Sequence, residues 1–220
     1  MATILSLITF CITLTAFIYG VVRLFRKGKP FYFQILVCAV GCSALGQLSD
    51  FINYYCDSYD LMTSFTAGTL AYLGCYSFLL CANIGALNRV VNENSNVKVI
   101  LLSLIAPAVS VALHIWYLPL IMPLDPIVGV FLLLFFPLSA SCAYLNLKHL
   151  LMKPDAMGFL LGIRGCDICT LIIIFSSIVG LPLYWYFDGT PLPYLMDLAS
   201  SIALFGLVIS AIKGAKAWEI

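Results

Sequence analysis

Apolar residues fill long stretches of this chain, and the polar residues gather in short joints between those stretches. Six stretches hold no charged residue, and a seventh is interrupted only by Asp197. Because a bilayer contains no water to pair with backbone N–H and C=O groups, stretches of this kind form helices. Membrane β-strands would appear as alternating segments of about ten residues. The pattern predicts an all-α integral membrane protein with a seven-transmembrane-helix bundle, at residues 2–25, 31–56, 61–88, 98–118, 126–148, 156–187 and 191–213.

Composition agrees with this class of protein. Hydrophobic residues make up 63% of the 220 residues and charged residues 10%, whereas soluble domains carry about 25% charged residues. The helices use nearly the whole chain, which predicts one transmembrane domain over residues 1–220 in the lipid bilayer of the cell membrane. The net charge of +1 gives no indication of a nucleic-acid partner.

Lysine and arginine are distributed unevenly among the joints. All eleven except Arg164 fall in the first, third and fifth joints or in the C-terminal tail. Cytoplasmic joints collect these residues, and tyrosine and tryptophan mark the membrane interfaces. The pattern predicts an N-terminus outside and a C-terminus in the cytoplasm, with aromatic residues such as Tyr184 and Tyr194 at the outer interface.

Two dipeptides recur with the same spacing. Lys29-Pro30 and Gly41-Cys42 are matched by Lys153-Pro154 and Gly165-Cys166. With a central fourth helix, this indicates a 3+1+3 parallel repeat of the kind that transporters use. Coincidence in a sequence of such biased composition is the other interpretation.

Polar residues inside the predicted helices form an outer level near the N-terminal side. Ionisable residues in a bilayer are costly and are functional candidates. Asp197 precedes an apolar run of about 22 Å at helical rise, which is shorter than the ~30 Å hydrocarbon core, so we expect it inside the membrane. Asp50, Gln47 and His114 are predicted at the same level. An interfacial anchoring role for either carboxylate remains open.

A second, inner level lies toward the cytoplasmic side. Arg164 and Asp167 are three residues apart on one helix, where an ion pair can form. Asn83 and Asn146 are expected at the same depth. The two levels resemble the two gates of a transporter, and they equally resemble a bundle held by interfacial hydrogen bonds.

Cysteines and glycines point to packing rather than to chemistry. Cys166 and Cys169 form a C-x-x-C, but a structural zinc site needs four ligands, so we expect neither a metal nor a cofactor. Gly158 and Gly162 form a GxxxG, which brings helices close together. It serves packing within the monomer or, alternatively, a homodimer. Pro107, Pro137 and Pro182 lie inside the fourth, fifth and sixth helices; each removes a helical hydrogen bond and predicts a kink.

Residues 197–206 read Asp-Leu-Ala-Ser-Ser-Ile-Ala-Leu-Phe-Gly, and residues 182–185 read Pro-Leu-Tyr-Trp. These segments resemble the last and the sixth helices of microbial rhodopsins. Ser201 replaces the lysine that binds retinal there, which excludes a Schiff base on this helix. In length, orientation and 3+1+3 layout the chain is similar to SWEET-type sugar transporters, without the paired prolines of that family. Neither resemblance assigns the chain to a family.

The pattern is typical of a multi-pass transporter or permease for a small neutral or weakly charged solute. A receptor-like or accessory membrane subunit, which binds a ligand or partner without transport, is the alternative. The sequence contains no H-E-x-x-H or G-x-S-x-G motif, so we expect no enzymatic activity.

Overall fold

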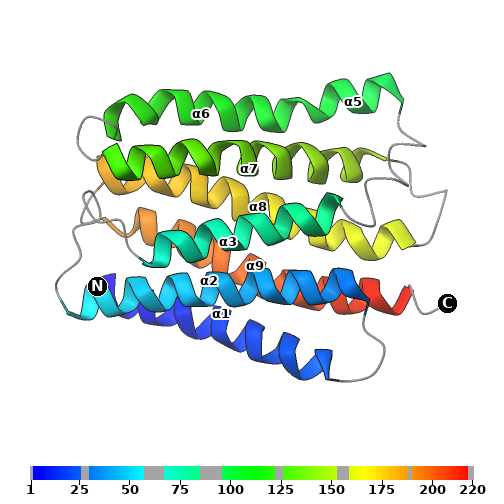
Figure 1. Cartoon of the computed structure of the whole chain (residues 1–220), viewed down its shortest axis with the longest axis horizontal. Helices are drawn as coiled ribbons and strands as arrows, with labels where there is room; N and C mark the ends of the chain where they lie inside the picture. The colour runs from blue at the N-terminus through cyan, green and yellow to red at the C-terminus, as the bar shows by residue number, and fades with distance from the viewer. Residues whose placement is uncertain are drawn as a thin grey trace.

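The computed structural model describes residues 2–25, 30–56, 67–84, 96–121, 126–152, 159–187 and 190–217. Helices account for almost all of these residues (Figure 1). Their bounds are α1 (Ala2–Leu24), α2 (Phe31–Tyr55), α3 (Ala67–Ala82), α5 (Val97–Ser103), α6 (Ile105–Ile121), α7 (Pro126–Leu151), α8 (Phe159–Tyr186) and α9 (Leu192–Ala217). Since α5 and α6 continue one another, the bundle has seven helices, and the prediction of an all-helical protein is confirmed.

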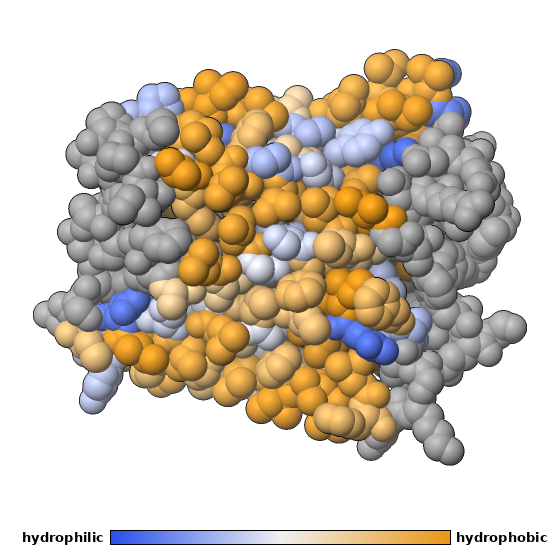
Figure 2. Space-filling view, viewed as in Figure 1, coloured by the Kyte–Doolittle hydropathy of each residue, from blue (hydrophilic) through white to orange (hydrophobic). Residues whose placement is uncertain are grey.

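Six of these helices are long and apolar enough to cross a bilayer, and α3 is a shorter apolar helix. The predicted third helix covers residues 61–88, of which 61–66 and 85–88 lie outside the described residues. Apolar side chains cover much of the visible face (Figure 2). Ile4 and Ile115 are each 66% exposed, which is favourable where lipid is the solvent. The chain is therefore an integral multi-pass membrane protein.

Successive helices run in opposite directions, so the N-terminus and the C-terminus lie at opposite ends of the bundle (Figure 1). We name these the N-terminal end and the C-terminal end. Every lysine and arginine within the described ranges lies toward the C-terminal end, in the terminal turns of helices or close to them. Those residues are Arg23, Lys98, Lys148, Arg164, Lys213 and Lys216.

Six helices form a closed ring in which α8 packs most extensively on α9. The ring continues from α9 to α1, α2, α3, α7 and back to α8. The broken helix of α5 and α6 stands outside this ring, where it packs mainly on α7 (Figure 1).

Small residues let α8 and α9 approach closely. A Cβ placed on Gly165 would lie 2.5 Å from the Ser210 hydroxyl oxygen, and one on Gly206 would lie 3.1 Å from the Cys169 sulfur. Such positions allow close backbone contact between membrane helices. Gly158 of the GxxxG lies outside the described residues, so a homodimer through Gly158 and Gly162 stays a prediction.

The break between α5 and α6 lies where Pro107 predicts a kink. Pro107 has no N–H to bond the carbonyl of Ser103, the last residue of α5. The Leu104 N–H bonds the Leu101 carbonyl at 3.2 Å, which tightens that turn. The two other prolines deep in the bundle, Pro137 and Pro182, stay inside the continuous helices α7 and α8.

Candidate functional site

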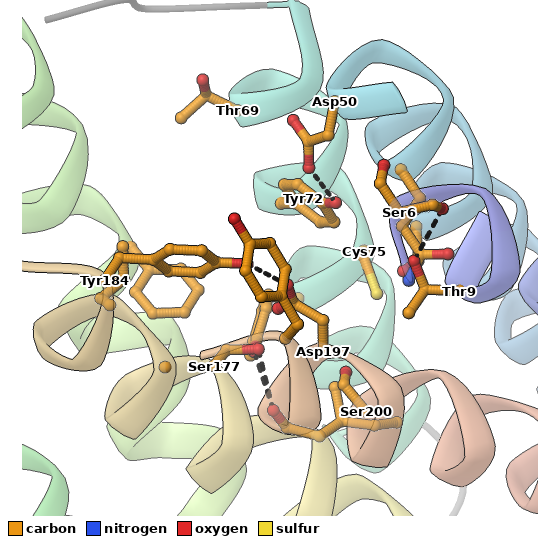
Figure 3. A pocket seen from close by; sticks show the side chains of 18 of the residues that line it. Ser6, Thr9, Asp50, Thr69, Tyr72, Cys75, Ser177, Tyr184, Asp197 and Ser200 are labelled. Atoms are coloured by element: carbon orange, nitrogen blue, oxygen red, sulfur yellow. Dashed lines mark hydrogen bonds between the residues drawn. The ribbon is translucent and has the colours of Figure 1, made fainter. Parts of the chain in front are cut away.

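A cavity of about 220 Å³ lies in the half of the bundle toward the N-terminal end (Figure 3). All six helices of the ring contribute to its wall. The polar part of the wall comes from Ser6, Thr9, Ser43, Gln47, Asp50, Thr69, Tyr72, Ser177, Tyr184, Tyr194, Asp197 and Ser200. Apolar side chains close it on the side of α7 and the middle of α8, namely Phe131, Leu132, Phe135, Ile173 and Leu181.

Each of the two carboxylates in the wall is held by a tyrosine from a neighbouring helix. The Tyr72 hydroxyl on α3 donates to Oδ2 of Asp50 on α2 at 2.6 Å. The Tyr184 hydroxyl on α8 donates to Oδ2 of Asp197 on α9. Burial of a carboxylate is costly unless it is hydrogen-bonded, and these bonds offset part of that cost. They also orient both carboxylates at the cavity (Figure 3).

Gln47 joins α2 to α9 across the bundle. It is only 7% exposed, and its Nε2 donates to Oγ of Ser201 at 2.9 Å. The Ser201 hydroxyl in turn donates to the Asp197 carbonyl at 2.9 Å. Since this bond uses the only hydroxyl proton, Ser201 can only accept from Gln47, which assigns the orientation of the amide. Oε1 of Gln47 is buried and has no hydrogen-bond partner in the described part of the chain.

Two carboxylates, those of Asp50 and Asp197, line this cavity. None of the described residues in the wall is a lysine, arginine or histidine. An ionised carboxylate offers only acceptors. The cavity is therefore built to receive hydrogen-bond donors or positive charge.

The sequence predicted four residues at this level, and the structure brings three of them together. His114 is buried in α6, and it is not among the described residues that line the cavity. Its Nδ1 lies 2.7 Å from the Ser110 carbonyl oxygen. Its ring packs on Tyr117 and Phe136, with centroid separations of 5.3 and 5.0 Å. This is the environment of a packing histidine.

The two predicted inner asparagines bond within their own helices. Nδ2 of Asn83 donates to the Leu79 carbonyl at 3.0 Å, and Nδ2 of Asn146 donates to the Cys142 carbonyl at 2.7 Å. Both side chains are buried. Each bond uses one N–H of the amide within its own helix.

Asp167 pairs with His149 of α7 and not with Arg164 of its own helix. Its Oδ1 lies 3.2 Å from Nδ1 of His149, and each side chain is 1% exposed. Arg164 instead donates to the Met152 carbonyl at 2.7 Å. The predicted helix 126–148 ended before His149, but α7 runs to Leu151 because apolar residues continue past it. Among the described residues, the neighbouring helix therefore supplies the partner of Asp167 and the acceptor for Arg164.

The tyrosines that hold the carboxylates carried no specific signal in the sequence. Tyr184 fitted the pattern of an outer aromatic belt, and Tyr72 was one aromatic residue among many in an apolar stretch. Only the packing of α3 on α2 and of α8 on α9 shows what they bind.

Cys166 of the C-x-x-C makes a contact between helices. The Cys166 thiol points to the Leu207 carbonyl on α9, with the sulfur 4.0 Å from the oxygen. Within the described ranges there is no group of three or more His, Cys, Asp or Glu residues arranged to hold a metal ion.

No known protein family, curated protein or solved structure matches this chain. We therefore base the functional proposal on the geometry of the cavity.

Proposed function

We propose that this protein is a permease-like transporter of a small neutral or weakly charged solute and that the cavity is its solute site. The observation that carries this proposal is the position of the cavity, which lies between the triplet α1–α3 and the triplet α7–α9 and is lined by carboxylates from both. Solute sites of transporters lie at such interfaces between structural repeats.

The packing order of the helices supports a repeat. In one triplet α1 packs on α2 and α2 on α3, and in the other α7 packs on α8 and α8 on α9. The contact of α1 with α9 has its counterpart in the contact of α3 with α7. A two-fold axis that relates the triplets would produce these pairs, with α5 and α6 as the linker outside the ring.

The distribution of basic residues supports an orientation. The described lysines and arginines lie toward the C-terminal end, and cytoplasmic ends of membrane proteins collect such residues. The N-terminal end, with the cavity, then faces the outside of the cell membrane. Fully buried side chains fill the other half of the ring, including Ile163, Leu204 and Leu207. This arrangement is that of an outward-facing state.

Transport would follow from rocking of one triplet against the other. Asp50 and Asp197 act as the outer gate in this mechanism, because they stand on opposite triplets at the cavity, and their tyrosine bonds keep each carboxylate with its own triplet. Gln47 and Ser201 join α2 to α9 across the two triplets and must separate or slide as the triplets move. Asp167 and Arg164 are the candidates for the inner gate, and their bonds to His149 and to the Met152 carbonyl hold them within the triplet α7–α9.

Uptake into proteoliposomes by the purified protein tests this function. A panel of radiolabelled sugars, amino acids, polyols and amines is presented at fixed pH, and Asp197→Asn is compared with the wild-type chain. Lys213→Gln is the matched control, since it removes one charge from an exposed side chain at the other end of the bundle. We expect uptake of at least one solute that Asp197→Asn reduces and Lys213→Gln leaves unchanged.

The closed C-terminal half also favours a second candidate, a receptor-like or accessory subunit that binds a ligand without transport. It predicts saturable binding that depends on Asp197 but no accumulation inside proteoliposomes. Binding and uptake measured on the same preparation separate the two functions.

A further inference from the structure

The two carboxylates of the cavity lie at a similar depth in the bundle. Gln47 and Asp50 are three residues apart on α2, and Asp197 and Ser201 are four residues apart on α9, so each pair shares one helix face. The hydrogen bond from Gln47 to Ser201 joins these two faces. Asp50 and Asp197 therefore each lie about one helical turn from this bond, toward the N-terminal end, and both line the cavity.

The hydrogen-bond directions leave the two carboxylates as acceptors toward the cavity. Each carboxylate accepts a tyrosine hydroxyl at Oδ2 only, as far as the described residues show. The Gln47 amide turns its NH₂ toward Ser201, and its Oε1 is buried without a donor within the described part of the chain. A ligand that brings N–H donors into the cavity can therefore bond the carboxylates.

We propose that the cavity binds the ammonium group of a small primary amine, a substrate class that rests on and narrows the proposed function. An ammonium group has three N–H donors and carries a positive charge. Two carboxylates line this cavity, and none of the described residues in its wall is a lysine or arginine. The aromatic rings of Tyr72, Tyr76 and Tyr184 in the wall suit a cation, because the ring face is negative.

The size and the apolar wall of the cavity define the rest of the ligand. A volume of about 220 Å³ lies below the roughly 300–1,000 Å³ of pockets for drug-sized ligands, so the ligand is a small molecule. Phe131, Leu132 and Ile173 stand on the side away from the acceptors. A short alkyl chain attached to the ammonium group would pack there.

Three probes of equal size test this specificity on the wild-type protein in lipid nanodiscs. Propylammonium, propanol and propionate differ only in a positive, neutral or negative polar group. Thermal stabilisation is followed against concentration at one ionic strength, set with potassium chloride, because binding to the native state raises the unfolding temperature. Tetramethylammonium, which has charge but no N–H donor, and sodium chloride complete the series.

We expect propylammonium to stabilise the protein with an apparent Kd at least about tenfold below those of propanol and tetramethylammonium, and propionate to show no saturable effect. Asp50→Asn and Asp197→Asn should each weaken propylammonium about tenfold or more, and Lys213→Gln should leave it unchanged. Equal stabilisation by propanol, or equal stabilisation by sodium, would overturn the proposal. The probe series alone decides this if a variant does not fold.

The outcomes also separate this inference from the proposed function. Amine binding without uptake in proteoliposomes supports the ammonium site and contradicts transport. Uptake of a sugar or polyol that propylammonium does not inhibit supports transport and contradicts the ammonium site.

Discussion

The Tyr184 hydroxyl on α8 is hydrogen-bonded to the Asp197 carboxylate on α9, at the most extensive helix contact in the bundle. The same arrangement occurs on the other side of the cavity, where Tyr72 on α3 holds Asp50 on α2. Each carboxylate is thus bound by the helix that packs most closely on its own. The positions are exchanged between the two halves: Asp50 lies on the earlier helix of its pair and Tyr72 on the later one, whereas Tyr184 lies on the earlier helix and Asp197 on the later one.

Removal of the tyrosine hydroxyl should weaken both the fold and the site. Tyr184→Phe leaves the ring in place and takes away the donor to Asp197. A hydrogen bond to a charged group contributes about 1.5–3 kcal/mol, so the unfolding temperature in nanodiscs should fall and solute uptake should drop. Tyr19→Phe is the matched control, because Tyr19 bonds Arg23 near the C-terminal end and does not line the cavity. Equal effects of the two substitutions would show that the bond to Asp197 has no special role.

The contact between α8 and α9 should not tolerate a larger residue at Gly165. A Cβ there would lie 2.5 Å from the Ser210 hydroxyl oxygen and 2.9 Å from its Cβ. Gly165→Ala should therefore lower stability by about 1–3 kcal/mol, the usual cost of overpacking. Gly180→Ala is the comparison, since its added Cβ would lie 3.5 Å from the nearest atom, the Met196 Cβ. The double variant Gly165→Ala/Ser210→Gly should recover most of the loss, and its failure to do so would argue against this contact as the cause.

Replacing only one residue of the buried His149–Asp167 pair should lower the free energy of unfolding strongly. His149→Leu leaves the Asp167 carboxylate without its described partner, and an uncompensated buried charge costs about 3–5 kcal/mol. The double variant His149→Leu/Asp167→Leu removes both groups and should be much closer to the wild type in chemical unfolding. If the single and double variants were equally unstable, the loss would come from packing rather than from charge.

The orientation of the chain can be measured with cysteine labelling. Cys56 follows α2 at the N-terminal end, and Lys98 lies in the first turn of α5 at the other end; both are exposed. In a chain whose other cysteines are serine, a membrane-impermeant maleimide should label Cys56 in intact cells. In the Cys56→Ser background, Lys98→Cys should react only after permeabilisation. The reverse pattern would place the cavity on the cytoplasmic side and contradict the outward-facing assignment.

The helices themselves follow from patterns that depend on neighbours in the sequence. Long apolar runs must pair their own backbone groups in lipid, and this requirement alone predicts the spans from residue 2 to residue 213. Pro107 predicts the break between α5 and α6 for the same reason, since the lost hydrogen bond is local. The positions of Asp50 and Asp197 near the same end of the bundle also follow from counting residues along each helix.

The partners of the polar side chains do not follow from the sequence, because they come from helices far apart along the chain. Gln47 and Ser201 are separated by 154 residues and yet form a hydrogen bond. His114 has the right depth to join them, but α6 lies outside the ring of helices. The imidazole of His114 packs instead on Tyr117 and Phe136. The local spacing of Arg164 and Asp167 allowed a bond within the helix, whereas the structure pairs Asp167 with His149 of α7.

By itself the sequence determined that this protein is a helical, multi-pass membrane protein, and it identified the carboxylates that sit in its apolar spans. Only the tertiary structure decided that Asp50 and Asp197 face one cavity, that Tyr72 and Tyr184 hold them, and that Gln47 bonds Ser201 across the bundle. The physical reason is that transfer into lipid depends on each segment alone, whereas a binding site depends on which faces of the helices pack together.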